Sequence, residues 1–433
     1  MKIAKWQLLF IPFFIAGGFA LYGVLHYGVN TPLWDEWSMV PLFQKVDHHS
    51  LGLSDLWAQH NEHRVLFPNM VLLVSAYATH WNIKAETLVS FVFSGVTALM
   101  LYLFVLSKLE RRYIALAASV LIAAWFYSPI QHENWLLGWQ VEWPMCVAGI
   151  VTAMYCIDRF STSKHGNHRL LFGLAVASAI VATYSLGGGL LVWPVGLGML
   201  VLYKQTRRLI SVWLAAAVLS ISAYYYGYHA PAGSPPTGLF IHQPLNFIKY
   251  VLSYIGSAIY ARPGRAVLIG AVLVALLILA LYMVWLGRSR IEKFVPWLGL
   301  IALALMAAAI TGIGRLGFGV AESMSSRYTA FSLLYVIGLT GLICAILDTL
   351  TPRQGMIGLV IMSISIPLLF VSYSYGMLGL KSQSASLQEV KYCTHQPDPD
   401  TACLLLTAPY PDRNTGLTGN QLKYIKAKHW AGY

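Results

Sequence analysis

The chain has 433 residues, of which 57% are hydrophobic and only 11% are charged. Soluble proteins usually carry about 25% charged residues, so this composition excludes an ordinary soluble domain and predicts a protein solvated by lipid. The net charge of +12 would suit nucleic acid. However, the basic residues stand in short clusters between apolar runs, which is a topology pattern. We therefore expect the lipid bilayer as a partner and no nucleic acid.

Apolar runs recur along the chain at about the 20 residues that a membrane helix needs. The first, Trp6 to Tyr27, is too long for a signal-peptide core and lacks a small-residue cleavage site, so it should remain as an anchor. The pattern predicts an all-α polytopic membrane protein with about eleven transmembrane helices (about 11–13). The predicted spans are 6–27, 87–107, 113–128, 141–157, 170–185, 187–203, 209–227, 266–287, 294–314, 328–347 and 355–378.

Charge divides the loops into two sets. One set is basic, and the positive-inside rule places it in the cytoplasm together with Met1–Lys5. The other loops and the C-terminus then face outward, so we expect a multi-pass protein of the bacterial inner membrane with a periplasmic C-terminus. The basic residues of the first set are Lys108, Arg111, Arg112, Arg159, Lys164, Arg169, Lys204, Arg207, Arg208, Arg288, Arg290, Lys293 and Arg353.

Two shorter apolar stretches, Val65–Trp81 and Phe247–Ala261, border outward segments. They are expected as re-entrant or interfacial helices, and the alternative is that both cross the membrane. We expect a transmembrane catalytic domain over residues 1–380, with a first outward loop at 28–86, and a small outward tail at 381–433. Cys393 and Cys403 stand in that tail, where an oxidising periplasm would permit a disulfide; two free thiols are the alternative.

Candidate chemistry begins in the first outward loop. Asp35 and Glu36 are adjacent carboxylates between Trp34 and Trp37, and a carboxylate there can serve as a base. The alternative is a helix cap beneath an interfacial Trp belt.

The same loop continues with His60, Glu62, His63 and Arg64. If the segment is helical, His60 and Arg64 share one face. A polar substrate or phosphate site is favoured over zinc, because the spacing matches no strong metal signature; a solvated loop face is the alternative. No metal and no cofactor are expected.

A second outward loop mixes acids with aromatic rings at His132, Glu133 and Trp135. Rings beside amide and carboxylate groups suit a sugar, although an interfacial Trp belt has the same composition. Glu142 at the start of the next span favours function, since an ionisable group is costly there. The tight turn Gly187–Gly189 lets backbone approach a ligand or a neighbouring helix.

Arg315, Arg327 and Tyr328 lie at an outward boundary, where the charge rule offers no reason for basic residues. An arginine there suits bidentate contact with phosphate. An intramolecular ion pair with Glu322 is the alternative.

Taken together, the acidic pair Asp35-Glu36, the following His60–Arg64 segment, the many spans and the late Ser326-Arg327-Tyr328 resemble the GT-C superfamily of membrane glycosyltransferases. The chain is most similar to bacterial enzymes that use a polyprenyl-phosphate sugar, such as O-antigen-modifying glucosyltransferases. The resemblance implies that Asp35 acts on the acceptor hydroxyl, with Glu36 as a less certain partner, and that Arg327 contacts the donor phosphate.

The implied reaction moves one sugar from a polyprenyl-phosphate donor to an outward glycan or lipid-linked acceptor. Asp35 would be the base, and Arg327, helped by Arg315, Arg64 or Arg262, would stabilise the leaving phosphate. A single displacement inverts the anomeric centre, whereas a covalent intermediate on Glu36 or Glu142 would retain it. The rival functions are a transporter or flippase of lipid-linked sugar and an O-antigen polymerase or ligase.

Overall fold

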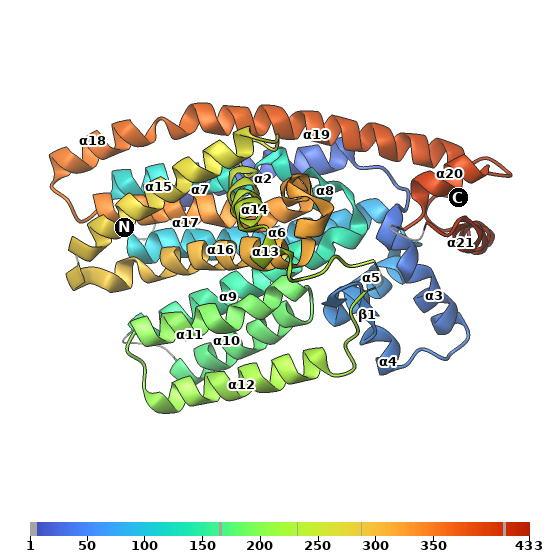
Figure 1. Ribbon diagram of the computed structural model, residues 1–433, viewed down its shortest axis with the longest axis horizontal. Helices are drawn as coiled ribbons and strands as arrows, with labels where there is room; N and C mark the ends of the chain where they lie inside the picture. Colours follow the sequence, from blue (N-terminus) through green and yellow to red (C-terminus); the bar gives the residue numbers. More distant parts are fainter. Residues whose placement is uncertain (1–6, 164–166, 232, 287, 410–412) are drawn as a thin grey trace.

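The computed structural model describes residues 7–163, 167–231, 233–286, 288–409 and 413–433. Within these residues the protein is an all-α bundle whose long helices run side by side along its long axis (Figure 1). The one sheet in the described residues is a two-stranded antiparallel hairpin in which His60 faces His63. The predicted fold class, an all-α polytopic membrane protein, is confirmed.

The long and medium helices of the bundle are α2 (Ile11–Tyr27), α6 (Ile83–Lys108), α7 (Arg112–Phe126), α9 (Glu142–Thr162), α10 (His168–Thr183), α11 (Val192–Leu202), α12 (Arg207–Tyr225), α15 (Arg265–Leu286), α16 (Val295–Arg315), α17 (Thr329–Leu347), α18 (Pro352–Met362) and α19 (Ser365–Thr394). The shorter elements are α3 (Val40–Asp47), α4 (Leu53–Leu56), β1 (Gln59–His60), β2 (His63–Arg64), α5 (Leu66–Thr79), α8 (His132–Leu136), α13 (Leu239–His242), α14 (Pro244–Gly256), α20 (Thr401–Thr407) and α21 (Thr415–Ala427). The 3-10 turns are η1 (Leu8–Phe10), η2 (Trp34–Met39), η3 (Pro129–Gln131), η4 (Gly138–Val141), η5 (Gly187–Leu191), η6 (Arg288–Lys293), η7 (Leu316–Phe318), η8 (Val320–Met324) and η9 (Ser326–Tyr328).

The burial pattern of the bundle is that of a membrane protein. Almost every side chain of α9 and α17 is buried, so these two helices form its centre. The outer helices α12, α15 and α19 instead expose large apolar side chains such as Leu219, Ile278 and Phe370. Exposed apolar surface over whole helices requires a lipid environment. Nine helices in the described residues are long and apolar enough to cross a membrane.

The basic loops lie together at one end of the bundle, which we call the basic end, and ion pairs connect them. Lys108 at the end of α6 pairs with the buried Asp158 near the end of α9. Lys293 at the end of η6 pairs with Asp348 at 3.0 Å and with Glu110 at 2.8 Å. Loops that the charge rule assigns to one compartment are therefore neighbours in space. The predicted basic segments Met1–Lys5 and Lys164 lie outside the described residues.

The opposite end, which we call the site end, holds the first loop and the tail (Figure 1). The shorter helices α10 and α11 also traverse the bundle. Gly187, between them, contacts His63 at the site end, and Tyr203 after α11 contacts Asp158 at the basic end. With the nine long spans they give the eleven passages that the sequence predicts.

The two uncertain apolar stretches form helices that are shorter than α10, which has 16 residues, and shorter than the stretch Gly187–Leu202 that joins η5 to α11. α5 has 14 residues and α14 has 13, so at 1.5 Å per residue each is about 20 Å long, against about 30 Å of hydrocarbon. These lengths favour the re-entrant or interfacial alternative. α14 packs closely on α15, and glycines at the contact make this possible. An added Cβ at Gly256 or Gly270 would lie only 1.9 Å from a backbone oxygen of the other helix.

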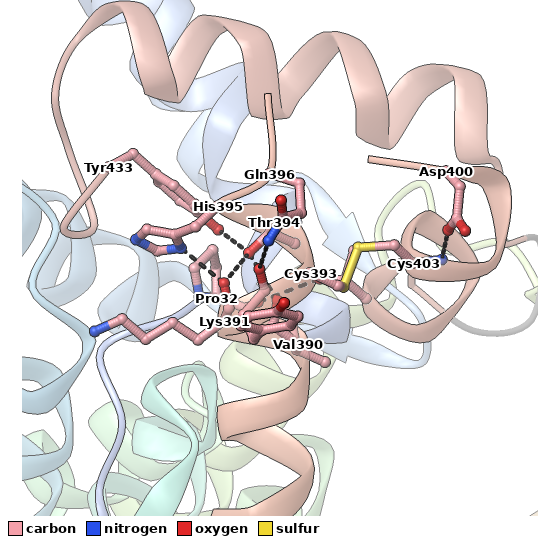
Figure 2. The surroundings of a disulfide bond; sticks show 12 residues. Pro32, Val390, Lys391, Cys393, Thr394, His395, Gln396, Asp400, Cys403 and Tyr433 are labelled. Atoms are coloured by element: carbon pink, nitrogen blue, oxygen red, sulfur yellow. Dashed lines mark hydrogen bonds between the residues drawn. A yellow bond between two sulfur atoms is a disulfide. The ribbon is translucent and has the colours of Figure 1, made fainter. Parts of the chain in front are cut away.

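The C-terminal tail packs on the first loop and forms a second hydrophobic cluster with it. Trp430 meets the ring of Phe43 at 5.3 Å, and the Trp37 indole donates to Thr407 at 2.9 Å. Cys393 and Cys403 are joined in a disulfide beside this interface (Figure 2). α19 runs unbroken across residue 380, so the division at that position stays a prediction.

Candidate active site

Asp35 lies in η2, directly after the membrane helix α2. Trp34 before it adopts a φ of 53°, which is uncommon for a bulky residue, and such conformations concentrate at functional sites. The Asp35 side chain keeps 28% of its surface exposed, and its Oδ1 lies 3.8 Å from Nε2 of His60. The predicted catalytic carboxylate is therefore accessible and has an imidazole beside it.

Charge around Asp35 favours its ionised form. Burial opposes ionisation, but the contact with His60 and the positive charge of Arg327 outweigh it, so the pKa of Asp35 lies below its ordinary value. Asp35 is then a carboxylate at neutral pH, as a proton acceptor must be.

Glu36 has a different role from its neighbour. It is 1% exposed, and its carboxyl accepts hydrogen bonds from the backbone amides of Leu33 at 2.7 Å, Gly138 at 2.6 Å and Trp139 at 3.3 Å. Burial raises its pKa to about 8 against these hydrogen bonds, which favour the anion. Glu36 therefore fastens η2 to η4, and we assign it a positioning role. A covalent role would need it to leave all three amides.

The His60–Arg64 segment is the β1–β2 hairpin and not a helix, so the condition under which His60 and Arg64 would share a helical face is not met. Asn61, at the turn, takes a φ of 47°, which a helix interior does not allow. Burial lowers the pKa of His63 to about 4, so this residue is neutral, and its Nδ1 accepts from Gly187 N–H at 3.2 Å. Nε2 of His63 consequently carries the proton.

Arg64 directs its guanidinium toward backbone carbonyls, which favours a structural role over the predicted phosphate contact. Its guanidinium is buried and donates to the carbonyls of Trp57 at 3.0 Å, Tyr224 at 3.1 Å and Tyr226 at 2.6 Å. These contacts use the N–H donors of the guanidinium and connect the hairpin to the end of α12. Arg262 lies in the exposed loop before α15, with its guanidinium 5.8 Å from the Tyr260 ring centroid.

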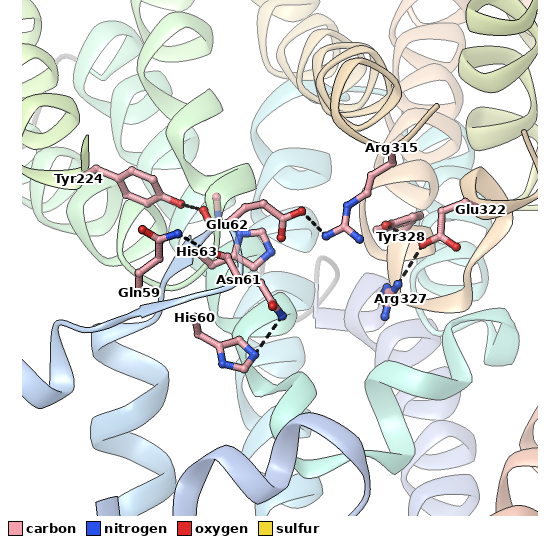
Figure 3. A network of polar contacts seen from close by, with 11 residues as sticks. Gln59, His60, Asn61, Glu62, His63, Tyr224, Arg315, Glu322, Arg327 and Tyr328 are labelled. Atoms are coloured by element: carbon pink, nitrogen blue, oxygen red, sulfur yellow. Dashed lines mark hydrogen bonds and ion pairs between the residues drawn. The ribbon is translucent and has the colours of Figure 1, made fainter. Parts of the chain in front are cut away.

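Two arginines face the hairpin from the other side (Figure 3). Arg315 ends α16 and forms an ion pair with Glu62. Arg327 in η9 lies 3.0 Å from Glu322, and the hydroxyl of Tyr328 donates to the same carboxylate at 3.1 Å. All of these side chains except Tyr328 remain about a quarter to a third exposed, so they stay accessible. The ion pair between Arg327 and Glu322, which the sequence offered as the alternative to a phosphate contact, is thus present.

The second outward loop contributes only part of its predicted set. Glu133 lies beside η9, where its backbone N–H donates to Ser326 at 3.2 Å. Glu142 begins α9, is 5% exposed, and lies within electrostatic range of Asp35 and Arg327. His132 instead packs against Gly379 of α19, and Trp135 is a buried core residue near α2. Both lie on α8 with Glu133, but their side chains contact α19 and α2.

Tyrosines of α14 form a wall of the site that the sequence analysis missed. The ring of Tyr254 stacks on Tyr328 at 5.6 Å, and Tyr250 lies within electrostatic range of Arg315 and Glu322. Their spacing of four residues on one short amphipathic helix is the sequence signal that points them to the same side.

The glycine turn at residues 187–189 is explained by packing. An added Cβ at Gly189 would meet the Ala182 carbonyl at 1.8 Å, and one at Gly187 would meet His63 at 2.9 Å. The turn therefore supports the hairpin. No group of three or more His, Cys, Asp or Glu side chains within the described ranges is arranged to hold a metal.

No protein-family model matches the chain, and no curated protein sequence matches it. Among solved structures, the chain is similar to ArnT from Cupriavidus metallidurans bound to undecaprenyl phosphate, with 14% identity and a TM-score of 0.45. The match covers 99% of this chain and 77% of that chain. A likeness at this level carries no argument about fold or activity.

Proposed function

We propose that this protein is a GT-C-type membrane glycosyltransferase that moves a single sugar from a polyprenyl-phosphate donor to an outward glycan or lipid-linked acceptor. The observation that carries the proposal is the meeting of an accessible carboxylate, Asp35, with two accessible arginines, Arg315 and Arg327, at one end of a lipid-exposed bundle. A lipid-linked phosphate can reach such a site from the membrane. A sugar attached to it already has a good leaving group.

In this reaction the acceptor oxygen forms a bond to the anomeric carbon of the sugar. The bond from that carbon to the donor phosphate breaks, and its electron pair goes to the phosphate oxygen. Asp35 takes the proton of the acceptor hydroxyl, while Arg327 and Arg315 stabilise the phosphate as it gains charge. One base suffices for a single displacement, and Glu36 is occupied by backbone amides, so inversion is expected.

A transporter or flippase of lipid-linked sugar is the main rival. Transporters bind their substrate near the bilayer midplane, often between internal repeats. Here the ionisable side chains around Asp35 instead gather at one end of the bundle, in the first loop and at the ends of α16 and η9. Chemistry at an interface is a better account of that placement.

Transfer from radiolabelled polyprenyl-phosphate hexoses and pentoses, with undecaprenyl phosphate as the first carrier, tests the proposal. Wild-type protein should move label from the lipid to a glycan or a second lipid. Asp35→Asn should lose at least a hundredfold in rate, because the amide keeps the size of the side chain and loses its basicity. Asp55→Asn is the matched control in the same loop, since the ion-pair partner of Asp55 is Lys45 and not one of the proposed reacting groups; it should keep its rate. Label that changes leaflet without changing its lipid would favour the flippase.

We further propose that the site end faces the periplasm of a bacterial inner membrane. A reporter active only outside the cytoplasm should be strong when fused after Leu380 and silent after Arg112. The reverse pattern would place the site in the cytoplasm and remove the reason for a lipid-phosphate donor.

A further inference from the structure

One short stretch of chain joins the two halves of the proposed site. At its start, Gly138 donates to Glu36, the neighbour of Asp35, and the ring of Trp139 lies 4.5 Å from that of His60. At its end, the ring of Trp143 lies 5.7 Å from Tyr328, the neighbour of Arg327. Residues 138–143 therefore run from the proposed base to the proposed phosphate contact. A sugar in transit must occupy the space between these two groups.

The same stretch carries three buried polar side chains whose hydrogen-bonding capacity is not fully used. Gln140, Glu142 and Trp143 are 6%, 5% and 7% exposed. Within the described residues, Oε1 of Gln140 has no hydrogen-bond partner, and the Glu142 carboxyl and the Trp143 indole N–H are within reach of each other but Oε2 and Nε1 form no well-aligned hydrogen bond. Burying such a group without a hydrogen bond is costly, and native proteins satisfy nearly all of them. Three within four residues, beside the reacting groups, indicate that a ligand supplies the missing bonds.

The chemistry of the three groups fits a polyhydroxylated ring. An amide oxygen accepts, an indole N–H donates, and a carboxyl group can accept from a hydroxyl. The indole ring also offers an apolar face for sugar C–H groups. Glu142 lies within electrostatic range of both Asp35 and Arg327, which places it beside the bond that would break.

We propose that Gln140, Glu142 and Trp143 form the subsite that holds the hydroxyl groups of the transferred sugar and selects among sugars. This inference rests on the proposed function and deepens it. It predicts that discrimination between sugars resides in η4 and the first turn of α9, while the lipid phosphate is held by η9 and α16.

The test uses purified full-length protein and monodeoxy analogues of the polyprenyl-phosphate sugar that the wild type transfers. Polyprenyl-phosphate glucose and its monodeoxy analogues are the first series. A site built to bond a hydroxyl rejects the analogue that lacks it, so the wild type should lose about tenfold or more in kcat/KM at each contacted position. Glu142→Gln, Trp143→Phe and Gln140→Leu should each be slower on the full sugar, and each should become insensitive to deoxygenation at its own position.

Trp297→Phe is the control. Trp297 is also buried with an unpartnered indole N–H, but it lies in α16 against Gly341, within the helix core. Its variant should keep the wild-type pattern across the deoxy series. Thermal stability of each variant shows whether a lower rate reflects less folded protein.

Two failures remain distinguishable. If the wild type transfers sugar and all three variants keep its deoxy pattern, the subsite is refuted and the proposed function stands. If the wild type transfers no sugar from any polyprenyl phosphate, the proposed function fails and the subsite fails with it. Loss of one hydroxyl contact in one variant, with the other positions unchanged, supports the proposal.

Discussion

Arg327 is the residue at which donor recognition and simple ion pairing predict different effects of substitution on the reaction rate and on stability. Its partner Glu322 lies at 3.0 Å, and the two side chains are 31% and 26% exposed. Ion pairs with this much solvent contribute about 0–1 kcal/mol to stability. Breaking this pair should therefore change the folded fraction very little. A preorganised contact to a charge that develops in the transition state is worth about 2.7–4 kcal/mol, or about 10²–10³ in rate.

Arg327→Ala should consequently lose at least a hundredfold in turnover while its thermal stability falls only slightly. Arg327→Lys keeps a charge and loses the bidentate fork, so it should fall between the wild type and the alanine variant. Glu322→Gln breaks the same ion pair from the other side. It should leave the rate within about fivefold of wild type, which is the factor that corresponds to about 1 kcal/mol.

The assay is label transfer from polyprenyl-phosphate sugar with purified variants, and turnover is divided by the amount of folded protein. Because the contact strengthens as the phosphate leaves, kcat and kcat/KM should fall together. Equal losses in Arg327→Ala and Glu322→Gln, both explained by less folded protein, would remove Arg327 from the site. A rise in KM alone would leave it as a binding residue without a part in the chemical step.

Three further outcomes follow from the structure. Glu36→Gln places an amide NH₂ against backbone N–H groups, which costs about 1–3 kcal/mol, so it should lower the thermal midpoint while turnover per folded molecule falls far less than in Asp35→Asn. Hydrogen bonds from Lys428 and two tyrosines outweigh burial and hold the pKa of Asp47 at about 2, below its ordinary 3.8; this stabilising effect is present above about pH 4 and lost toward pH 2, and Lys428→Met should remove most of it in an acid unfolding series. The pKa of His63 is lowered to about 4, so protonation favours the unfolded chain as pH falls from about 6.5 to 4, and hydrogen exchange of the hairpin should accelerate over that range; exchange that is flat with pH would contradict the neutral imidazole.

The amino-acid sequence predicts the bundle well because lipid imposes simple rules. Apolar runs must be helical, and basic loops must lie in one compartment, so Lys108 and Lys293 could be assigned to the same end before any contact was known. These features depend on local composition alone. Whether Val65–Trp81 and Phe247–Ala261 cross could not be settled in the same way, because each stretch is nearly as long as 187–203, which traverses the bundle. The shortness of α5 and α14 is a finding of the structure.

The site was only partly predictable, because side-chain direction depends on backbone geometry. Asp35 and Glu36 look alike in sequence, but the 3-10 turn after Trp34 leaves one accessible and buries the other against backbone amides. Arg64 looked like a phosphate ligand, yet its guanidinium donates to three backbone carbonyls, and two of these lie 160 and 162 residues away at the end of α12. Partners so far apart in the chain leave no local periodicity by which to foresee them.

The docking of the tail on the first loop sets the order in which this protein can mature. Trp37 and Thr407, which share a hydrogen bond, are 370 residues apart. At about 5–20 residues per second, the ribosome needs about 20–70 s to make that interval. During this time the first loop has left the membrane with Trp37 and Phe43 uncovered. The segment around Asp35 therefore reaches its final shape only after the last helices are inserted, and until then the newly made loop is a surface that chaperones or proteases can engage.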